Sequence, residues 1–157
     1  MRNSWGDQWG DPCDFGTEAQ KERYLPDLLT GDAVGSFAFT EPDTGSDVAS
    51  IRTSARRDGD SFVVDGSKTF ITNGAEGDFY TTAVRTGTEP DASGISLLVI
   101  DADTPGVRVA NRLAKLGWHS SDTAELVFEG ARVPAENLIG DDMDRVPEIA
   151  RCVPAHR

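Results

Sequence analysis

The chain has 157 residues, with 15 Lys and Arg against 27 Asp and Glu, so its formal net charge at pH 7 is −12. This length favours one domain built around one main core. The acidic residues are spread along the chain, which disfavours nucleic acid and anionic membrane surfaces as partners. No apolar run has the length of a membrane span, and Cys13 and Cys152 form no redox or zinc motif. We therefore expect a reduced, cytoplasmic protein.

A helix signal comes first in chain order, in the stretch GTEAQKERYLPDLLTGD. Thr17 and Gln20 have the spacing of a capping box, and Gly31 suits a C-terminal stop. One apolar face is made by Tyr24, Leu25, Leu28 and Leu29. Because proline disrupts a helix, Pro26 predicts that the first helical piece ends near Tyr24. Two short helical pieces are expected.

Short apolar or alternating runs recur from Gly35 onward, separated by turn signals. The eight runs are GSFAFT, TSARR, SFVVDG, KTFITN, YTTAVRT, ISLLVID, GVRVAN and AELVFEGARV. They predict a mainly β fold, an antiparallel β-barrel or sandwich, preceded by the short helices. Asp58-Gly59 predicts a hairpin turn, and Asp65-Gly66 predicts a second turn that joins FVV to KTFIT.

These signals divide the chain into four parts. Residues 1–15 have no periodic pattern and are expected to be irregular, whereas residues 16–34 carry the helical signal. Residues 35–140 form the β domain, and residues 141–157 form a patternless tail.

Two kinds of catalytic site are weighed and set aside. Residues 119–122, HSSD, suggest a Ser-His-Asp triad, but triad members converge in space and follow no adjacency rule, so a polar loop is favoured. The chain has only two histidines, which excludes a three-His zinc site, and the acidic run at 141–144 is interpreted as solvated. No metal is expected.

Three stretches each pair a strand with an edge of small polar residues. They are FAFTEPDTGSD (37–47), GSKTFITNGAEGDFY (66–80) and LGWHSSDTAELVFEGARVPAENLIG (116–140). A shared rim with aromatic faces, hydroxyls and amide donors suits a flat heterocycle that carries phosphates. Ordinary hairpin ends with Ser and Thr caps are the alternative. The residues alone leave both open.

The first stretch also contains turn chemistry suited to an anion. Pro42 fixes φ, and Gly45 permits positive φ, so that Gly45 and Ser46 can turn N–H donors towards a phosphate. Glu41 and Asp43 are interpreted as turn residues beside Pro42 rather than as acid–base groups.

The three stretches resemble the middle β-domain of the acyl-CoA dehydrogenase family. FAFTEPDTGSD is similar to the family signature TEPxxGSD, and KTFITNG to the segment K-x-W/F-I-T-N-G. SSDTAELVFEGARVPAENLIG is similar to the family's SDT…F…VP..N..G run. The resemblance covers about residues 16–140, and residues 16–34 look like the last helices of the family's N-terminal domain.

The resemblance implies FAD as cofactor and α,β-dehydrogenation of an acyl-CoA thioester to a trans-2-enoyl-CoA, with electron-transferring flavoprotein as the usual oxidant of the flavin. By position, Phe37, Phe39 and Thr40 lie along the flavin ring, and the Thr40 hydroxyl bonds its pyrimidine edge. Gly45 and Ser46 face the pyrophosphate, and Ser46 also borders the CoA arm.

The second stretch supplies the other implied contacts: Phe70 replaces the aromatic residue beside the ring, Ile71 follows it, and Thr72 reaches the N5 and O4 edge. Donors at this edge stabilise charge that develops on the flavin as hydride arrives.

The family's catalytic glutamate lies on downstream helices, and Glu148 falls in a segment with no family match, so no catalytic residue is assigned. We expect weak or no flavin binding, no turnover and no tetramer from this chain alone. A non-catalytic β-barrel that binds a ligand or a partner is the alternative function.

Overall fold

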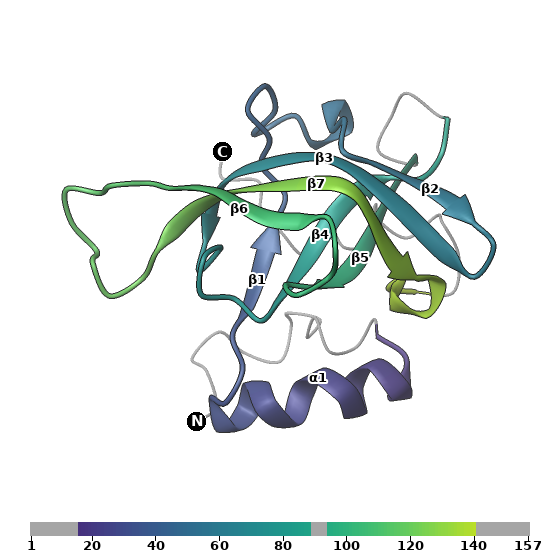
Figure 1. Cartoon of the computed structure of the whole chain (residues 1–157), viewed down its shortest axis with the longest axis horizontal. Coiled ribbons are helices and arrows are strands. Elements are labelled where there is room, and N and C mark those ends of the chain that lie inside the picture. Colours follow the sequence, from purple (N-terminus) through teal and green to yellow (C-terminus); the bar gives the residue numbers. More distant parts are fainter. Residues whose placement is uncertain (1–15, 89–93, 141–157) are drawn as a thin grey trace.

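The computed structural model describes residues 16–88 and 94–140, shown in colour in Figure 1. One helix and seven strands follow in chain order, with two short 3₁₀ helices: α1 (Glu18–Thr30), β1 (Gly35–Ala38), η2 (Val48–Ser50), β2 (Ser54–Asp58), β3 (Ser61–Thr72), β4 (Phe79–Arg85), β5 (Ile95–Asp101), β6 (Val107–Arg112), β7 (Thr123–Pro134) and η4 (Ala135–Asn137). The predictions made for 1–15 and 141–157, including both cysteines and the acidic run at 141–144, lie outside the described residues.

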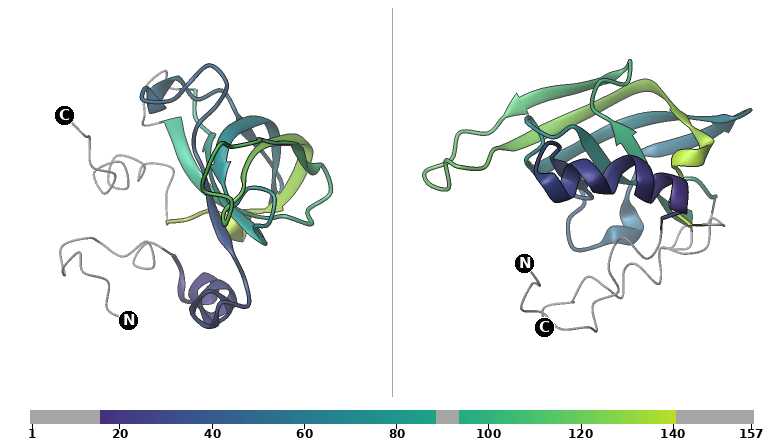
Figure 2. Two further views of the ribbon diagram at one scale, coloured as in Figure 1. Left: turned by 90° about the vertical axis from the view of Figure 1, so that its left-hand side faces the viewer. Right: turned by 90° about the horizontal axis from the view of Figure 1, so that it is seen from below.

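All seven strands belong to one curled sheet, which confirms the predicted mainly β fold. The strand order is β1-β4-β2-β3-β7-β6, and β5 pairs with β4. Most pairings are antiparallel, while β1 and β2 each pair in parallel with β4. Figure 2 shows the sheet curling into a half-barrel, with α1 lying outside it.

The strand β3 is continuous, so the turn predicted at Asp65-Gly66 is wrong. Its pairing with β7 shifts register between Val64 and Gly66, which marks a bulge rather than a turn. Gly66 has φ of 150°, and the Asp65 carboxylate accepts a hydrogen bond of 2.8 Å from the Gly130 N–H of β7. The chain therefore bends but stays paired. The hairpin predicted at Asp58-Gly59 is confirmed by the antiparallel pairing of β2 with β3.

Both predicted caps of α1 are confirmed. The Thr17 hydroxyl accepts from the Gln20 N–H, and the Gln20 side chain accepts from the Thr17 N–H. Gly31 adopts the left-handed conformation, with φ of 82°, and its N–H donates to the Asp27 carbonyl.

The prediction that Pro26 divides the helix is wrong, because α1 runs without interruption through it. Proline removes one backbone hydrogen bond, but contacts with η4 and with β5 hold the helix on the N-terminal side of this position. The Gln20 amide donates to the Glu136 carbonyl at 2.7 Å, and the Tyr24 hydroxyl donates to Asp101 at 3.0 Å. Within the described residues, no helix has the length and apolar character needed to cross a membrane.

Apolar side chains pack on both faces of β5. Leu98 and Ile100 of β5 belong to the main core cluster, which also contains Phe62, Leu126 and Phe128. Ile95 and Leu97, which precede them in β5, face the other way and join a smaller cluster with Ile51 and Ala83. Strand β5 is therefore buried on both faces.

We predict that Gly66→Ala destabilises the domain by about 1–3 kcal/mol, the range expected for overpacking. A Cβ atom at Gly66 would lie 2.6 Å from Thr53 Oγ1 and 2.7 Å from Thr53 Cα. Urea unfolding measures the effect. Gly117→Ala is the matched control, because a Cβ there meets no atom within 4 Å and its φ is not in the left-handed region. Equal free energies of unfolding for both variants would contradict the prediction.

Candidate functional site

The end of β1 lies antiparallel to the end of β3. The Ser36 hydroxyl donates to the Asn73 carbonyl at 2.8 Å, and the Thr69 N–H donates to the Thr40 carbonyl at 2.8 Å. Because residue numbers rise along one segment as they fall along the other, these bonds bring the first two predicted stretches side by side (Figure 1).

Side chains alternate between the two faces of these segments. The buried set comprises Ser36, Ala38, Thr69 and Ile71. The other set, which we call the aromatic face, comprises the exposed Phe37, Phe70 and Thr72 and the partly buried Phe39, which also packs against the smaller core cluster. The rings of Phe37 and Phe39 are stacked, with centroids 4.5 Å apart and planes 7° apart. The structure therefore gathers four of the eight predicted site residues on one face.

Ile71 differs from the other predicted site residues, since its side chain is 2% exposed and belongs to the main core cluster. Only its main-chain atoms could meet a ligand on the aromatic face. Thr40, in contrast, is partly exposed, and within the described residues neither its N–H nor its hydroxyl has a hydrogen-bond acceptor.

Phe70 combines high exposure with an unfavourable backbone conformation. Its side chain is 66% exposed, and its φ is 56°, at the register shift between Lys68 and Ile71. The left-handed region costs an L-residue about 1–2 kcal/mol. Strain of this kind clusters at ligand sites, because the surrounding structure must hold it in place.

The turn after β1 is closed by its own backbone. The Glu41 N–H donates to the Thr44 carbonyl at 2.8 Å, and the Thr44 N–H donates to the Glu41 carbonyl at 3.1 Å. The Thr44 hydroxyl donates to the Ser50 carbonyl. Gly45 and Ser46 follow on the surface, and among the described residues nothing accepts a hydrogen bond from either N–H. Two donors are thus available to a ligand.

The expectation of a positive φ at Gly45 is wrong, because its φ is not in the left-handed region. A Cβ atom built there would meet no protein atom within 4 Å. The backbone of the turn closes without help from a special glycine conformation. The missing side chain leaves open space beside the two free N–H groups, as a closely approaching ligand requires.

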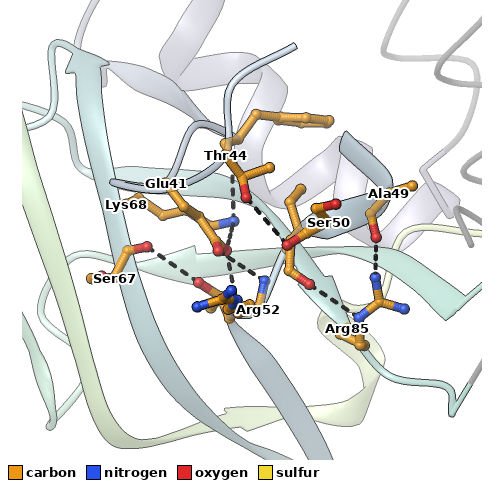
Figure 3. A network of polar contacts seen from close by, with 11 residues as sticks. Glu41, Thr44, Ala49, Ser50, Arg52, Ser67, Lys68 and Arg85 are labelled. Carbon is orange, nitrogen blue, oxygen red and sulfur yellow. Dashed lines mark hydrogen bonds and ion pairs between the residues drawn. The ribbon is translucent and has the colours of Figure 1, made fainter. Parts of the chain in front are cut away.

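A buried ion pair lies beneath this turn, where Lys68 is 0% and Glu41 is 6% exposed. Figure 3 shows the two side chains pointing towards one another. Lys68 Nζ is 2.9 Å from Glu41 Oε1 and donates to the Phe39 carbonyl at 3.1 Å. The Glu41 carboxylate also accepts from the N–H groups of Arg52 and Thr53, at 2.8 and 2.9 Å. One pair therefore connects the segment after β1, the strand β3 and the segment before β2.

The surroundings of this pair shift both of its pKa values. Burial acts to raise the pKa of Glu41, but hydrogen bonds from Thr53, Arg52 and Lys68 outweigh it and hold that pKa below its ordinary value. Burial lowers the pKa of Lys68, and the Glu41 carboxylate opposes that shift. Sequence reasoning placed Glu41 only in a turn, since no local pattern links residues 27 positions apart.

Arg85 at the end of β4 supports the same segment from the other side. Its side chain donates to the carbonyls of Ile51 and Ala49, at 3.0 and 2.5 Å (Figure 3). Its N–H donates to the Thr53 carbonyl at 2.7 Å. Arg85 thus fixes the loop that presents Gly45 and Ser46 at one end, and Lys68 fixes it at the other end through the Phe39 carbonyl.

The third predicted stretch meets the second through Asp122. Its carbonyl accepts from the Asn73 N–H at 3.0 Å, and its carboxylate accepts from the Ala75 N–H at 2.7 Å. The other carboxylate oxygen is buried and has no hydrogen-bond partner among the described residues. Asp122 thus orders the turn after Thr72, whereas His119 is exposed. This arrangement agrees with the loop that was favoured over a catalytic triad.

Comparison with known proteins connects this geometry to a family. The model "Acyl-CoA dehydrogenase, middle domain" matches residues 36–131. Mitochondrial isobutyryl-CoA dehydrogenase of Dictyostelium discoideum is 43% identical over 128 residues, which are 82% of this chain and 31% of that protein. A crystal structure of a probable acyl-CoA dehydrogenase from Mycobacterium abscessus matches with a TM-score of 0.82 and 52% identity, over 86% of this chain and 36% of its own.

A further solved structure, of a glutaryl-CoA dehydrogenase from Mycobacterium smegmatis in complex with FADH2, matches with a TM-score of 0.78 and 38% identity. The match covers 88% of this chain and 34% of that one. Fold and sequence therefore define the class, a middle β-domain of flavoenzyme type. The chain belongs to the acyl-CoA dehydrogenase family, which confirms the resemblance read from its motifs. It spans about a third of the length of these relatives.

We predict that Glu41→Gln lowers the free energy of unfolding by about 3–5 kcal/mol at pH 7, because it leaves the buried Lys68 charge without its counter-charge. The folded pKa of Glu41 lies below its unfolded value. Its stabilisation is therefore complete above an ordinary carboxyl pKa of about 4.3 and disappears as pH falls through the folded pKa. Urea unfolding between pH 7 and pH 3 should show this acid loss in the parent chain and a smaller one in the variant.

Asp43→Asn is the control for this series, because Asp43 is an exposed acid whose 3.5 Å ion pair with Arg52 is at the surface. Exposed pairs contribute about 0–1 kcal/mol. If Glu41→Gln lowers the free energy of unfolding no more than Asp43→Asn does, the Lys68–Glu41 pair does not stabilise the fold as predicted. Should Glu41→Gln fail to fold, the double variant with Lys68→Met removes both charges and should recover a folded chain.

We also predict that Phe70→Gly is more stable than Phe70→Ala by about 1 kcal/mol, because glycine adopts positive φ without strain. At Thr72, whose φ is not left-handed, the order should reverse, with Thr72→Ala the more stable variant. Denaturant midpoints of the four variants provide the measurement. The same order at both positions would refute a strained backbone at Phe70.

Proposed function

We propose that this chain supplies the FAD- and acyl-CoA-contacting surface of an acyl-CoA dehydrogenase. The observation that carries the proposal is the aromatic face, bordered by Thr40, Gly45 and Ser46, whose N–H groups have no acceptor within the described residues. A flat ring suits the stacked Phe37 and Phe39, and unpaired N–H groups beside a glycine suit a pyrophosphate. The residues present therefore fit FAD.

Residue by residue, Phe37, Phe39 and Thr40 contact the flavin ring. Gly45 and Ser46 donate to the pyrophosphate, and Ser46 also borders the CoA arm of the substrate.

From β3, Phe70 packs beside the ring, the Ile71 main chain continues that edge, and Thr72 donates to the N5 and O4 side. These donors stabilise negative charge where it develops. The chemistry that flavin supplies when bound is acceptance of hydride from the substrate β-carbon while a base removes the α-proton, which gives a trans-2-enoyl-CoA. Electron-transferring flavoprotein is the expected partner for reoxidation.

None of the residues assigned to this surface carries a carboxylate, so the base is not assigned to it. The chain also spans only about a third of its relatives. We therefore propose that the 157-residue chain binds FAD weakly, does not assemble as a tetramer and catalyses no dehydrogenation by itself. In the same proposal, residues 16–34 correspond to the end of a helical domain and 35–140 to the middle domain. A cytoplasmic location remains a prediction.

A titration of the ¹⁵N-labelled chain with FAD tests the assignment. We expect weak binding, with amide shift changes concentrated on the aromatic face and at Gly45 and Ser46. Gly45→Ala should weaken binding severalfold while changing the free energy of unfolding by less than about 0.5 kcal/mol, since its Cβ enters open space. Thr72→Ala should also weaken binding.

Ser61→Ala, at the opposite end of β3, is the control and should bind FAD as the parent chain does. Shifts that fall elsewhere, or none, would refute the surface assignment and favour a non-catalytic module. Tight FAD binding with bleaching by an acyl-CoA would instead overturn the proposal that the chain is inactive alone.

A further inference from the structure

The peptide unit between Phe39 and Thr40 has an unusual pair of neighbours. Its carbonyl oxygen accepts from the Lys68 ammonium at 3.1 Å. Its N–H, on the Thr40 side, has no acceptor among the described residues. A full positive charge therefore contacts one end of a peptide dipole, and the other end is unused by the chain.

Burial makes this contact stronger than it would be at the surface. Lys68 is 0% exposed, so water does not screen its charge. Hydrogen bonds in series polarise one another, by about 10–30% per bond in condensed-phase estimates. Because the carbonyl and the N–H share one conjugated unit, charge drawn towards the oxygen leaves the Thr40 N–H a stronger donor.

Glu41 fixes the direction of this effect. Its Oε1 lies 2.9 Å from the same ammonium, and its carboxylate also accepts from the N–H groups of Arg52 and Thr53. The ammonium therefore contacts the peptide directly, while the carboxylate has further partners of its own in Arg52 and Thr53. The Thr69 N–H donates to the Thr40 carbonyl at 2.8 Å and fixes the next peptide as well.

We propose that Lys68, held by Glu41, is a positioning residue that orients and polarises the Phe39–Thr40 peptide so that the Thr40 N–H becomes a strengthened donor to an electron-rich ligand edge on the aromatic face. The identity of the ligand as a flavin rests on the proposed function. The polarisation of the peptide by Lys68 is independent of that function. In a flavin complex this donor favours the reduced ring, whose pyrimidine edge carries the added negative charge.

The test compares the ¹⁵N-labelled parent chain with the double variant Glu41→Gln/Lys68→Met, which removes both charges. We expect the Thr40 amide proton to move upfield in the variant, while the Asn73 amide, whose bond to the Asp122 carbonyl is retained, stays in place. A merely structural pair would shift both amides or neither. An unchanged Thr40 amide in a folded variant overturns the proposal.

The parent chain gives a second measurement that needs no variant to fold. Lys68 should show a slowly exchanging ammonium signal with scalar coupling across the hydrogen bond to the Phe39 carbonyl carbon. A rapidly exchanging Lys68 ammonium, or coupling to another carbonyl, overturns the proposal. An observed coupling to Phe39 supports it whether or not the chain binds flavin.

FAD titration separates this proposal from the proposed function. The double variant should bind about 2- to 5-fold more weakly than the parent, the loss expected for weakening one hydrogen bond, with Ser61→Ala unaffected. Equal affinity of parent and variant overturns the role of Lys68 in ligand binding. If the parent chain binds no FAD but the Thr40 amide responds to the variant, the polarised peptide stands and the flavin assignment fails.

Discussion

The site depends on two opposite charges that the fold buries side by side. Removing a charged group from water costs several kcal/mol even in real proteins, so the Lys68–Glu41 pair is stable only with further hydrogen bonds. The Phe39 carbonyl and two backbone N–H groups provide them. Those partners come from two segments, and Lys68 itself belongs to β3, so neutralising the pair fixes three segments relative to one another. The buried pair therefore sets the geometry of the surface that lies above it.

The aromatic face, unlike the buried ion pair, does not stabilise the fold. The exposed rings of Phe37 and Phe70 and the left-handed backbone at Phe70 do not favour folding of this region, whereas Phe39 packs against the smaller core cluster. Directly behind them, Ala38 and Ile71 are buried in the main core. Because strand side chains alternate, each destabilising outward residue is next to a stabilising inward one. The sheet thus supports a surface that would not be stable as an isolated loop.

Local sequence signals predicted what local physics controls. The capping box of α1, its glycine stop and the hairpin at Asp58-Gly59 depend on neighbouring residues alone, and the structure confirms them. A rim shared by the three motif stretches was predicted from their strand ends and small polar residues, and in the structure the three stretches do converge. The assignment to a family came from motif order, which physical reasoning about single residues could not have supplied.

Long-range contacts account for the predictions that were wrong. Pro26 does not break α1, because Gln20 anchors the preceding turns to η4 and Tyr24 anchors them to β5. Asp65-Gly66 has turn composition, yet the long partner β7 keeps both residues in one strand and turns the signal into a bulge. In each case tertiary pairing outweighed a local preference, and no window of sequence contains the partner.

The buried pair is the clearest case of a long-range contact that the local sequence does not predict. Glu41 beside Pro42 has all the local marks of a turn residue, and it does close a turn through its backbone. Its side chain nevertheless enters the core, because Lys68 lies across the sheet with no other counter-charge close to its ammonium among the described residues. A glutamate in a turn and a lysine in a strand are each unremarkable; together they fix the peptide that the aromatic face presents. The chemistry of this surface therefore depends on a contact between two segments, and that contact exists only in the folded chain.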